Sequence, residues 1–389
     1  MTVLYVLIST GPYGGATKSF MLLLNGVLRA GLNVIVVVPD TNGIYSTLCD
    51  MGIKVVVVPS KGNTWTGARN LKQRILYIPR QLGRIVINCK AKRKILNLLK
   101  NERIDIVHSN NTVTYMGRYV AEHLNIPHIY HVREYGDKDF GLRYFPTNRS
   151  FHKHLEAPGV YTICITKDIQ KHHGLSDNER SAVVYNGIID NSIGLNTGMK
   201  GRASLLYAGR IEPAKGLLEL VKAYSQYVKQ VPYPLQLIVA GQVTIPGYMH
   251  DIDELIKRNN LGEYIKFVGQ SGNMPELYKK SKAIVVSSEF EGFGRCMPEA
   301  MSYGCLVIGR NTGGTKEQFD NGLSLSGKEI GFRYNDRKEL VEALLHIDRI
   351  NEEEYVALQH SAYNVVSKLY SVENYVKSVL AIYDKILDK

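Results

Sequence analysis

Two glutamates in one short segment are the first candidates for chemistry. Glu291 and Glu299 lie eight positions apart in EFEGFGRCMPEAMSYG, residues 289–304. A carboxylate at the start of a helix can accept hydrogen bonds from two neighbouring hydroxyls, such as those of a ribose. A carboxylate in the preceding loop can hold sugar hydroxyls or the charge of an oxocarbenium-like transition state. Each glutamate taken alone fits a solvated position or a helix-dipole contact better, so only the whole segment is specific.

The residues around these glutamates predict a tight loop followed by a short helix. Gly292 and Gly294 allow the loop to fold tightly. Pro298 suits the first position of a helix, and Gly304 would end that helix after about two turns. The free backbone amides of residues 295–297 would then point toward the same space as the second glutamate, where they can bind phosphate.

A second loop, YAGRIEPAKG at residues 207–216, carries two cations. Arg210 ends a predicted strand, and Lys215 begins the next helix. Arginine binds an anion through parallel hydrogen bonds and lysine binds it as a point charge, so both can converge on one diphosphate. There they would stabilise the negative charge that develops on a leaving group. The alternative is a pair of solvated surface charges.

A third loop, GPYGGATKSF at residues 11–20, follows the first predicted strand. Gly14 and Gly15 permit positive φ and a close approach of the backbone to a ligand. Thr17 or Ser19 could cap the following helix, whose N-terminus favours an anion. The segment is neither GxGxxG nor a P-loop, so a strand–turn–helix connection without a ligand is equally compatible with it.

Alternating strands and helices must position these loops. Continuous β-branched apolar runs, typical of parallel strands buried on both faces, recur along the chain. They lie at residues 3–9, 33–39, 54–59, 104–109, 127–132 and 161–166, then at 203–210, 235–241, 264–269, 283–288 and 305–310. Helical patterns separate them, which predicts an α/β protein with two doubly wound, Rossmann-like parallel sheets facing a cleft. Ligands bind such sheets at the carboxyl ends of the strands, where the three loops lie.

The domain boundaries follow from composition. A segment rich in Gly, Asn and Ser, residues 186–202, is the predicted linker. We expect an N-terminal domain at residues 1–185 and a C-terminal domain at 203–365. The final amphipathic helix, residues 366–389, is expected to pack back on the N-terminal domain.

Composition limits the class of protein. Hydrophobic residues make up 44% of the 389 residues, which is enough for two buried cores. The five cysteines are odd in number and include no CxxC pair, so we expect neither a disulfide framework nor a zinc knuckle. The first apolar run is short and lacks a basic flank, and no run approaches the ~20 residues of a membrane span. We therefore expect a cytoplasmic protein.

The net charge of +12 favours an anionic partner, and much of the excess lies in residues 69–100. This stretch places apolar residues at helical spacing among many Lys and Arg, and Pro79 should kink or divide it. A basic amphipathic helix predicts peripheral binding to the anionic inner face of the cell membrane. Alternatively, the apolar side joins the core. Nucleic acid is not expected, because no aromatic platform accompanies the charge. The apolar positions are Leu71, Ile75, Ile78, Leu82 and Ile85.

Together these loops resemble the retaining nucleotide-sugar glycosyltransferases of family four, which have the GT-B architecture. The resemblance covers nearly the whole chain, and its strongest element is the pattern Glu, seven residues, Glu. AGRIEPAKG matches the donor-phosphate loop of that family, and TGGTKEQF at residues 312–319 matches the following glycine loop. VVYNGI at 183–188 resembles the interdomain segment, and FVG at 267–269 the strand end near the nucleobase.

The resemblance implies a role for each matching residue of the second half. Arg210 and Lys215 would bind the donor diphosphate, Glu299 the ribose hydroxyls and Glu291 the donor sugar. The backbone of Phe293 and Gly294 would lie beside the sugar, and Val268 and Gly269 near the base.

In the first half, the resemblance implies that Gly14 and Gly15 approach the diphosphate from the opposite domain. His131 matches a histidine that contacts the donor sugar, and it joins Glu291, Arg210 and Lys215 as a catalytic candidate. The local pattern His-Val-Arg-Glu departs from the His-Asp of many members. Arg133 and Glu134 are therefore alternatives that could share the role of His131.

The implied activity is that of a retaining hexosyltransferase acting in surface polysaccharide or glycoconjugate synthesis. The donor would be a nucleotide-diphosphate sugar, with UDP as the default and GDP or ADP open, and the acceptor a glycan or a lipid-linked sugar. No cofactor and no metal are implied, since the carboxylates form no DxD pair. A nucleotide-sugar 2-epimerase of the same architecture and a non-catalytic nucleotide-sugar-binding subunit are the alternatives.

Overall fold

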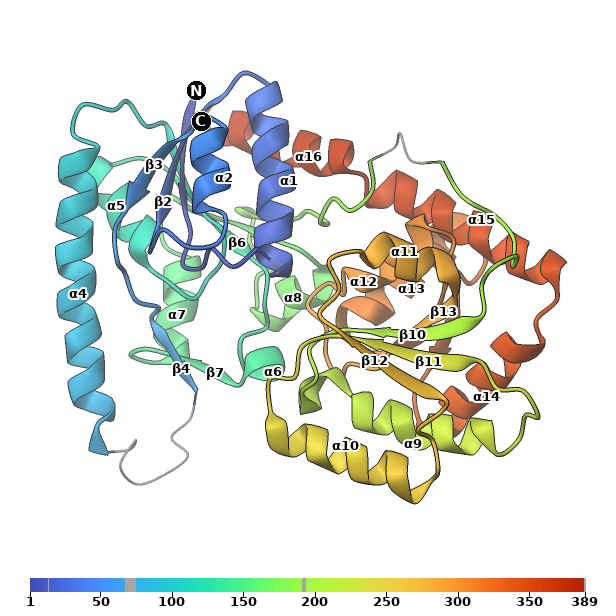
Figure 1. Ribbon diagram of the computed structural model, residues 1–389. Coiled ribbons are helices and arrows are strands. Elements are labelled where there is room, and N and C mark those ends of the chain that lie inside the picture. Colours follow the sequence, from blue (N-terminus) through green and yellow to red (C-terminus); the bar gives the residue numbers. More distant parts are fainter. Residues whose placement is uncertain (13, 67–74, 191–193, 388–389) are drawn as a thin grey trace. The chain divides into compact units, whose positions relative to one another are not determined.

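The computed structural model describes residues 1–12, 14–66, 75–190 and 194–387 (Figure 1). The chain forms two compact units. Unit 1 comprises Met1–Gly187 and Val372–Lys389, and unit 2 comprises Ile188–Ser371. The chain passes from unit 1 to unit 2 after Gly187, near the start of the predicted linker, residues 186–202. It returns to unit 1 after Ser371, beyond the boundary expected at residue 366.

Unit 1 is built on a seven-stranded sheet in which every pair of neighbours is parallel. The strand order is β3-β2-β1-β5-β6-β8-β9, so β1 lies near the middle with β2 on one side and β5 on the other. Continuous Val and Ile runs form the central strands because both faces of the sheet are covered. The strands are β1 (Thr2–Val6), β2 (Asn33–Val38), β3 (Lys54–Val57), β5 (Ile106–Ser109), β6 (His128–Val132), β8 (Val160–Cys164) and β9 (Ser181–Val183).

Helices cover both faces of this sheet. One apolar core joins the sheet to α1, α2 and α16, and a second core joins it to α4 and α5. Three shorter helices complete the unit. Along the chain α6 follows β6, α7 precedes β8, and α8 follows β8. The helices are α1 (Gly15–Arg29), α2 (Tyr45–Asp50), α4 (Tyr77–Leu98), α5 (Met116–Leu124), α6 (Asp137–Phe140), α7 (Asn148–Leu155), α8 (Lys167–His172) and α16 (Val372–Leu387).

The last helix, α16, is an integral part of unit 1. It buries Tyr375, Val379 and Tyr383 in the same core as β1 and α1. The two helices approach closely, because a Cβ on Gly26 of α1 would lie only 2.2 Å from the side chain of Val376. Figure 1 shows the red α16 beside the blue α1. The chain thus returns from unit 2 to complete the first core.

A small antiparallel pair, β4 (Thr64–Thr66) and β7 (Leu142–Tyr144), stands apart from the main sheet. Trp65 of β4 packs on Tyr77, with ring centroids 4.2 Å apart, and the Arg143 guanidinium lies over the Trp65 ring. Strands of three residues carry too short a pattern to be predicted from sequence.

Unit 2 contains a six-stranded parallel sheet in the order β12-β11-β10-β13-β14-β15. Five of its strands coincide with the runs predicted from sequence. The sixth, β15, has three residues and was not predicted. The strands are β10 (Ser204–Ala208), β11 (Gln236–Ala240), β12 (Ile265–Gly269), β13 (Ser281–Val286), β14 (Leu306–Arg310) and β15 (Phe332–Tyr334).

The helices of unit 2 also lie on both faces of its sheet. Helices α9, α10 and α14 bury their apolar residues in one large core, and α15 contacts both α12 and α13. The elements are η1 (Pro213–Lys215), α9 (Leu217–Val228), α10 (Pro246–Arg258), α11 (Met274–Lys280), α12 (Cys296–Ser302), α13 (Gly313–Ser326), α14 (Arg337–Arg349) and α15 (Glu352–Leu369).

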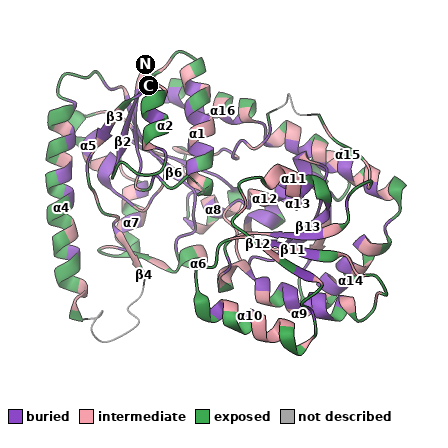
Figure 2. Ribbon diagram, in the orientation of Figure 1, coloured by how far each residue is buried: buried purple, intermediate pink, exposed green. Residues whose placement is uncertain are grey.

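Helix α4 tests two expectations for the basic segment. The segment is divided close to Pro79, as predicted, because Ile75 is helical, Leu76 is a turn and α4 begins at Tyr77. Pro79 lies in the first turn of α4, where its missing N–H breaks no helical hydrogen bond. Ile75, Ile78, Leu82 and Ile85 are exposed, so this apolar stripe does not join the core (Figure 2). Leu71, the first residue of the predicted stripe, lies outside the described residues.

The inward face of α4 is unusually polar in its first half. Gln81 and Asn88 are buried there, followed by Ala91 and Ile95. Asn88 binds the backbone N–H and C=O of Lys61, both at 2.9 Å. Within the part of the chain that the structure describes, no helix has the length and apolar character needed to span a bilayer.

Candidate functional site

Two loops at the carboxyl ends of β10 and β13 pack against each other in unit 2. Gly216 ends η1 with φ +69°, and a Cβ there would lie 2.0 Å from the carbonyl oxygen of Ser287. The Ser287 hydroxyl donates to the carbonyl of Lys215 at 2.9 Å. Only glycine fits this position, and the contact fixes Lys215 relative to the loop that carries the first glutamate.

Lys215 and Glu291 form an ion pair. The Lys215 Nζ lies 2.6 Å from Glu291 Oε1, and the Ser288 hydroxyl donates to the same oxygen at 2.6 Å. Both charged side chains are largely buried, with 21% and 16% exposure. Burial by itself would lower the pKa of Lys215, but the charge and hydrogen bond of Glu291 outweigh it and the pKa is raised. The lysine is therefore a fixed cation.

Arg210 lies near this pair but is oriented differently. Its guanidinium binds Glu212 at 2.9 Å, and the side chain is 46% exposed. Its charge acts on Lys215, where it opposes the rise in pKa. Arg210 and Lys215, the two predicted cations, are therefore close enough for their charges to interact.

Glu299 lies in the first two turns of α12, as expected, but the helix begins earlier than predicted. It starts at Cys296, so Pro298 is the third helical residue and not the first. Arg295 contacts Glu299 Oε1 through two nitrogens, each at 3.1 Å, and the Tyr278 hydroxyl donates to Oε2 at 3.1 Å. The predicted Gly304 follows the helix with φ +70°, in the left-handed region.

The thiol of Cys296 lies close to three charged side chains, those of Glu291, Glu299 and Lys215. Burial, and then the charges of Glu291 and Glu299, raise the pKa of this thiol to about 12, while Lys215 opposes them. All three groups are therefore close enough to act on one sulfur atom. Cys296 itself stays a thiol at neutral pH.

The first turn of α13, which contains Gly313 and Gly314, packs directly on the Glu291 loop. The Gly314 N–H donates to the carbonyl of Glu291 at 2.8 Å, and a Cβ on Gly314 would lie 2.7 Å from the oxygen of Gly292. The buried amide of Gln318 donates to the carbonyl of Phe293. Gly294 adopts φ +73°, so the tight turn predicted there is present.

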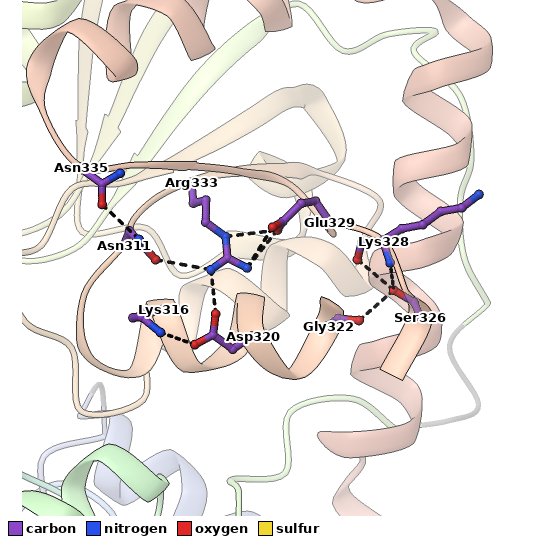
Figure 3. A network of polar contacts seen from close by, with 9 residues as sticks. All are labelled: Asn311, Lys316, Asp320, Gly322, Ser326, Lys328, Glu329, Arg333 and Asn335. Carbon is purple, nitrogen blue, oxygen red and sulfur yellow. Dashed lines mark hydrogen bonds and ion pairs between the residues drawn. The ribbon is translucent and has the colours of Figure 1, made fainter. Parts of the chain in front are cut away.

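A polar network anchors the distant side of α13 (Figure 3). Arg333 of β15 binds Asp320 at 2.7 Å and Glu329 at 3.0 Å, and Lys316 binds the other oxygen of Asp320. The network ties α13 to β15, while the first turn of the helix supports the Glu291 loop. Helix α13 therefore helps to position the loop that carries the Glu291 carboxylate.

Val268 and Gly269 end the edge strand β12. Gly269 has φ +67°, and its carbonyl accepts from Gly241 N–H at 2.8 Å. Val268 is an exposed apolar side chain. The strand end therefore presents an exposed apolar side chain.

In unit 1 the first loop differs from the expectation in two respects. The helix cap is Gly14, with φ −69°, a conformation open to any residue, so positive φ is not the reason for glycine there. Thr17 and Ser19 are not caps, because both are buried inside α1. Gly14 and Gly15 are exposed at the start of α1, which leaves their backbone accessible.

His131 is completely buried in β6. Its Nδ1 lies 3.3 Å from Arg133 Nη2 and 3.2 Å from His108 Nε2. Because a guanidinium can only donate, Nδ1 accepts and the ring proton sits on Nε2. Burial, then the charge of Arg133 and then His108, hold the pKa of His131 well below its usual value, so the ring is neutral. Nε2 has no hydrogen-bond partner among the described residues.

Behind His131 lies a chain of buried polar groups. His108 Nδ1 lies 2.6 Å from the Tyr383 hydroxyl, which in turn lies 2.8 Å from the Tyr5 hydroxyl. Arg133 also donates to Asn186 at 2.7 Å and to Tyr375 at 3.0 Å. Helix α16 thereby fixes the orientation of the predicted histidine.

Comparison with known protein families gives these loops a context. The family model of the group 1 glycosyl transferases matches residues 196–363, and that of glycosyltransferase family 4 matches residues 13–191. The chain belongs to the group 1 glycosyltransferases. The first match contains all the candidate residues of unit 2, and the second contains Gly14, Gly15 and His131.

Individual relatives of this glycosyltransferase agree. It is 27% identical over 298 residues to the uncharacterized glycosyltransferase MJ1178 of Methanocaldococcus jannaschii, covering 75% of this chain and 78% of that protein. It is 25% identical over 230 residues to the capsular polysaccharide biosynthesis glycosyltransferase CapH of Staphylococcus aureus, covering 56% of this chain and 62% of that protein.

Solved structures establish the architecture of the glycosyltransferase. The complex of Anabaena Alr3699/HepE with UDP and glucose aligns with a TM-score of 0.75 at 19% identity over 99% of each chain. The lipopolysaccharide outer core galactosyltransferase WaaB aligns with a TM-score of 0.70 at 16% identity over 99% of this chain and 100% of that one. These likenesses, with the two parallel sheets, show the GT-B fold.

Several supporting residues of this glycosyltransferase were not predicted from sequence. Ser288, Tyr278 and Arg295 each bind one of the two glutamates, and Gln318 holds the backbone between them. Arg295 alone had a detectable signal, since it lies four residues before Glu299 on a helix. The other contacts join segments far apart in the sequence.

Proposed function

We propose that this glycosyltransferase moves a hexose from a nucleotide-diphosphate donor, with UDP as the default nucleotide, to a glycan or lipid-linked acceptor with retention of anomeric configuration. The observation that carries the proposal is the unit 2 assembly of Lys215, Glu291 and Glu299. These three groups are partly buried, act on one locality and are held by glycine contacts between loops.

Each residue of the assembly has a proposed task. Lys215 and Arg210 bind the donor diphosphate, and their charge stabilises the negative charge that grows as the diphosphate leaves. Glu299 accepts hydrogen bonds from the two ribose hydroxyls, and Glu291 binds the donor sugar. Cations of the protein perform the task that a metal performs elsewhere, so the proposal includes no metal and no cofactor.

Relatives with known roles support the class of substrate. CapH is named for capsular polysaccharide biosynthesis, and the Anabaena protein was crystallised with UDP and glucose. A mannosyltransferase of Rhizobium meliloti, named for lipopolysaccharide core biosynthesis, is 26% identical over 152 residues, which cover 39% of this chain and 42% of that protein. We therefore propose a role in building a surface polysaccharide or glycoconjugate.

Retention would follow if the acceptor approached from the side on which the diphosphate departs. In this scheme the acceptor oxygen bonds to the anomeric carbon while the bond from that carbon to the diphosphate breaks. The backbone around Phe293 and Gly294 would lie beside the sugar. His131, as a neutral Nε2–H donor, would hydrogen-bond a sugar oxygen.

Mass spectrometry tests the proposal. The protein is incubated with UDP-, GDP-, ADP- and dTDP-sugars and a panel of glycan and lipid-linked acceptors. We expect free nucleoside diphosphate, a product heavier by one hexose and, by NMR, the anomeric configuration of the donor. An altered sugar still on its nucleotide would indicate a 2-epimerase. Tight donor binding without turnover with any acceptor would indicate a binding subunit.

We also propose that α4 holds the enzyme on the anionic inner face of the cell membrane. Ile78, Leu82 and Ile85 form an exposed apolar stripe, with Val86 beside it. The helix carries no acidic residue. Apolar side chains would enter the headgroup boundary while the bases attract acidic lipids. Its basic residues are Arg80, Arg84, Lys90, Lys92, Arg93 and Lys94.

Vesicle sedimentation tests this part. Wild-type protein should bind vesicles containing anionic phosphatidylglycerol and not neutral phosphatidylcholine vesicles. The double variant Ile78→Ser and Leu82→Ser should lose most of that binding and keep its melting temperature, because both side chains are exposed. A matched control is Leu323→Ser, an exposed leucine on α13. Equal binding by wild type and double variant would contradict the proposed role of α4.

A further inference from the structure

Glu134 is a buried carboxyl group at the carboxyl end of β6 in unit 1, and only 6% of it is exposed. One of its oxygens, Oε1, accepts two hydrogen bonds from Thr112, from the backbone N–H at 2.9 Å and from the hydroxyl at 2.6 Å. Thr112 belongs to the loop that follows β5, the neighbouring strand. The carboxyl group is therefore held in one orientation.

The second oxygen of Glu134 accepts no hydrogen bond from the residues that the structure describes. The side-chain oxygen of Asn111, one residue before Thr112, is buried without a partner among them. A buried oxygen without a partner is rare, and it indicates a ligand or ordered water that supplies the missing donor. The Asn111 oxygen and the ionised form of Glu134 can only accept, so the matching ligand presents O–H groups, as a saccharide does.

The surroundings of the carboxyl group explain its protonation. Burial is the largest cause that raises the pKa of Glu134, and the two hydrogen bonds from Thr112 only partly oppose it. Asp139 of α6 also raises the pKa and Arg133 lowers it, and the resulting pKa is about 7. His173, after α8, donates from its ring to the Glu134 carbonyl at 3.0 Å and is neutral near pH 7. The Tyr144 hydroxyl lies 3.0 Å from the Thr112 hydroxyl that donates to Glu134.

We propose that Glu134 binds the attacking hydroxyl of the acceptor sugar and takes its proton during transfer. The inference rests on the proposed function and names the acceptor side of the same reaction. The acceptor oxygen forms a bond to the anomeric carbon of the donor, and the bond from that carbon to the diphosphate oxygen breaks with its electron pair. The hydroxyl proton passes to Glu134, which later releases it to solvent.

The same region of unit 1 is linked to α4. Asn88 of α4 holds the backbone of Lys61, and Asn63 binds Val113 and Tyr115 in the loop after β5. A short segment therefore connects the basic helix to the loop that orients Glu134. An acceptor whose lipid is held at the membrane by α4 would present its sugar in the same unit as the carboxyl group.

The variant Glu134→Gln separates a chemical role from a structural one. A glutamine oxygen can still accept both bonds from Thr112, so the loop stays in place, but the amide cannot take a proton. Glu122→Gln is the matched control, because Glu122 is a half-exposed residue of α5 in an ion pair with Arg118. The donor Kd should stay at the wild-type value in both variants, and neither variant should melt at a lower temperature than wild type.

The decisive readout is kcat/KM for the acceptor between pH 5 and 9. Wild type and Glu122→Gln should lose activity below an ionisation near pH 7, where the carboxylate becomes protonated. Glu134→Gln should lose about 10²–10⁴-fold of its activity and show no such limb. The inference would be overturned if Glu134→Gln had wild-type activity and still lost it below pH 7 as the wild type does. If that variant fails to fold, a wild-type profile that is flat between pH 6 and 8 would overturn it instead.

Failure of the proposed function would look different. In that case wild-type protein would transfer no sugar from any donor, and the inference would fall with the reaction on which it rests. Transfer by wild type together with an unchanged Glu134→Gln variant would overturn the role of Glu134 alone.

Discussion

At the scale of single residues, the ion pair of Lys215 and Glu291 is the central feature of unit 2. Sequence alone suggested that each binds a different part of a donor, and the structure shows them 2.6 Å apart. The charge and hydrogen bond of Glu291 raise the pKa of Lys215 in spite of its burial, so the ammonium stays charged. The pair is therefore a preformed cation and anion that diphosphate and sugar hydroxyls can engage with little rearrangement.

Replacing Lys215 by alanine should lower kcat by about 10²-fold or more, because one donor to the leaving diphosphate is lost. It also leaves Glu291 without its cation, so donor affinity should fall as well. Turnover and the Kd for UDP measure these effects. Lys279→Ala is the matched control, since Lys279 forms an exposed pair with Glu276 on α11. Wild-type turnover in Lys215→Ala would contradict the assigned role.

Glu134 should make stability depend on pH. Its folded pKa of about 7 lies above the ordinary value of 4.5, so the folded state holds the proton more tightly than the unfolded state. The stability that this group contributes is complete below pH 4.5 and is lost as pH rises to about 7. The loss approaches ~1.4 kcal/mol for each pH unit in that window.

Glu134→Gln cannot ionise, so it should gain stability relative to wild type between pH 5 and pH 8. Urea unfolding at the two pH values measures the change, and Glu122→Gln, with its half-exposed side chain, serves as the reference. An equal difference between Glu134→Gln and wild type at both pH values would show that the carboxyl group is not perturbed.

At the scale of elements, glycine contacts between loops decide where the charges lie. Gly314→Ala in the first turn of α13 would place a Cβ 2.7 Å from the Gly292 oxygen and 2.9 Å from the Glu291 oxygen. The Glu291 loop must then move. We expect a loss of about 1–3 kcal/mol of stability and a donor affinity lowered by about 10-fold or more.

Thermal unfolding and UDP titration measure both effects of Gly314→Ala. Gly247→Ala in α10 is the control, because no atom lies within 4 Å of the added methyl group and its φ is negative. That variant should be neutral or slightly more stable. Equal behaviour of the two variants would show that the α13 contact does not position the site.

The elements also show what sequence can and cannot predict. Long Val and Ile runs predicted the central strands of both sheets, because burial on both faces leaves a continuous apolar pattern. The short strands β4, β7, β9 and β15 were missed, since three residues carry no period. The two glutamates and Lys215 were found through their spacing. Ser288 and Gln318 were not, because their roles depend on packing between distant segments.

At the scale of the whole molecule, each unit has its own sheet and core, and the chain returns through α16 to complete unit 1. The expected amphipathic end of the chain gave no hint that Tyr383 would join a buried chain of polar groups ending at His131. That chain depends on contacts between residues hundreds of positions apart. Stability of unit 1 and donor binding by unit 2 should therefore be separable.

Tyr383→Phe tests this separation. The change removes the hydroxyl that binds Tyr5 and His108 and leaves a buried ring nitrogen unpaired, at a cost of about 1–3 kcal/mol. The melting temperature should fall while the Kd for UDP stays at the wild-type value. Tyr233→Phe, at a tyrosine that is 89% exposed, should change neither. A loss of UDP affinity as large as that of Lys215→Ala would contradict independent roles.

We propose that the loops of unit 2 hold the donor through Lys215, Glu291 and Glu299, and a crystal structure with a bound UDP-sugar would show whether they do. We expect a diphosphate oxygen ~3 Å from Lys215 Nζ, with the ribose hydroxyls on Glu299 and the sugar beside Glu291. A nucleotide bound elsewhere, with the Lys215–Glu291 pair facing only water, would contradict it.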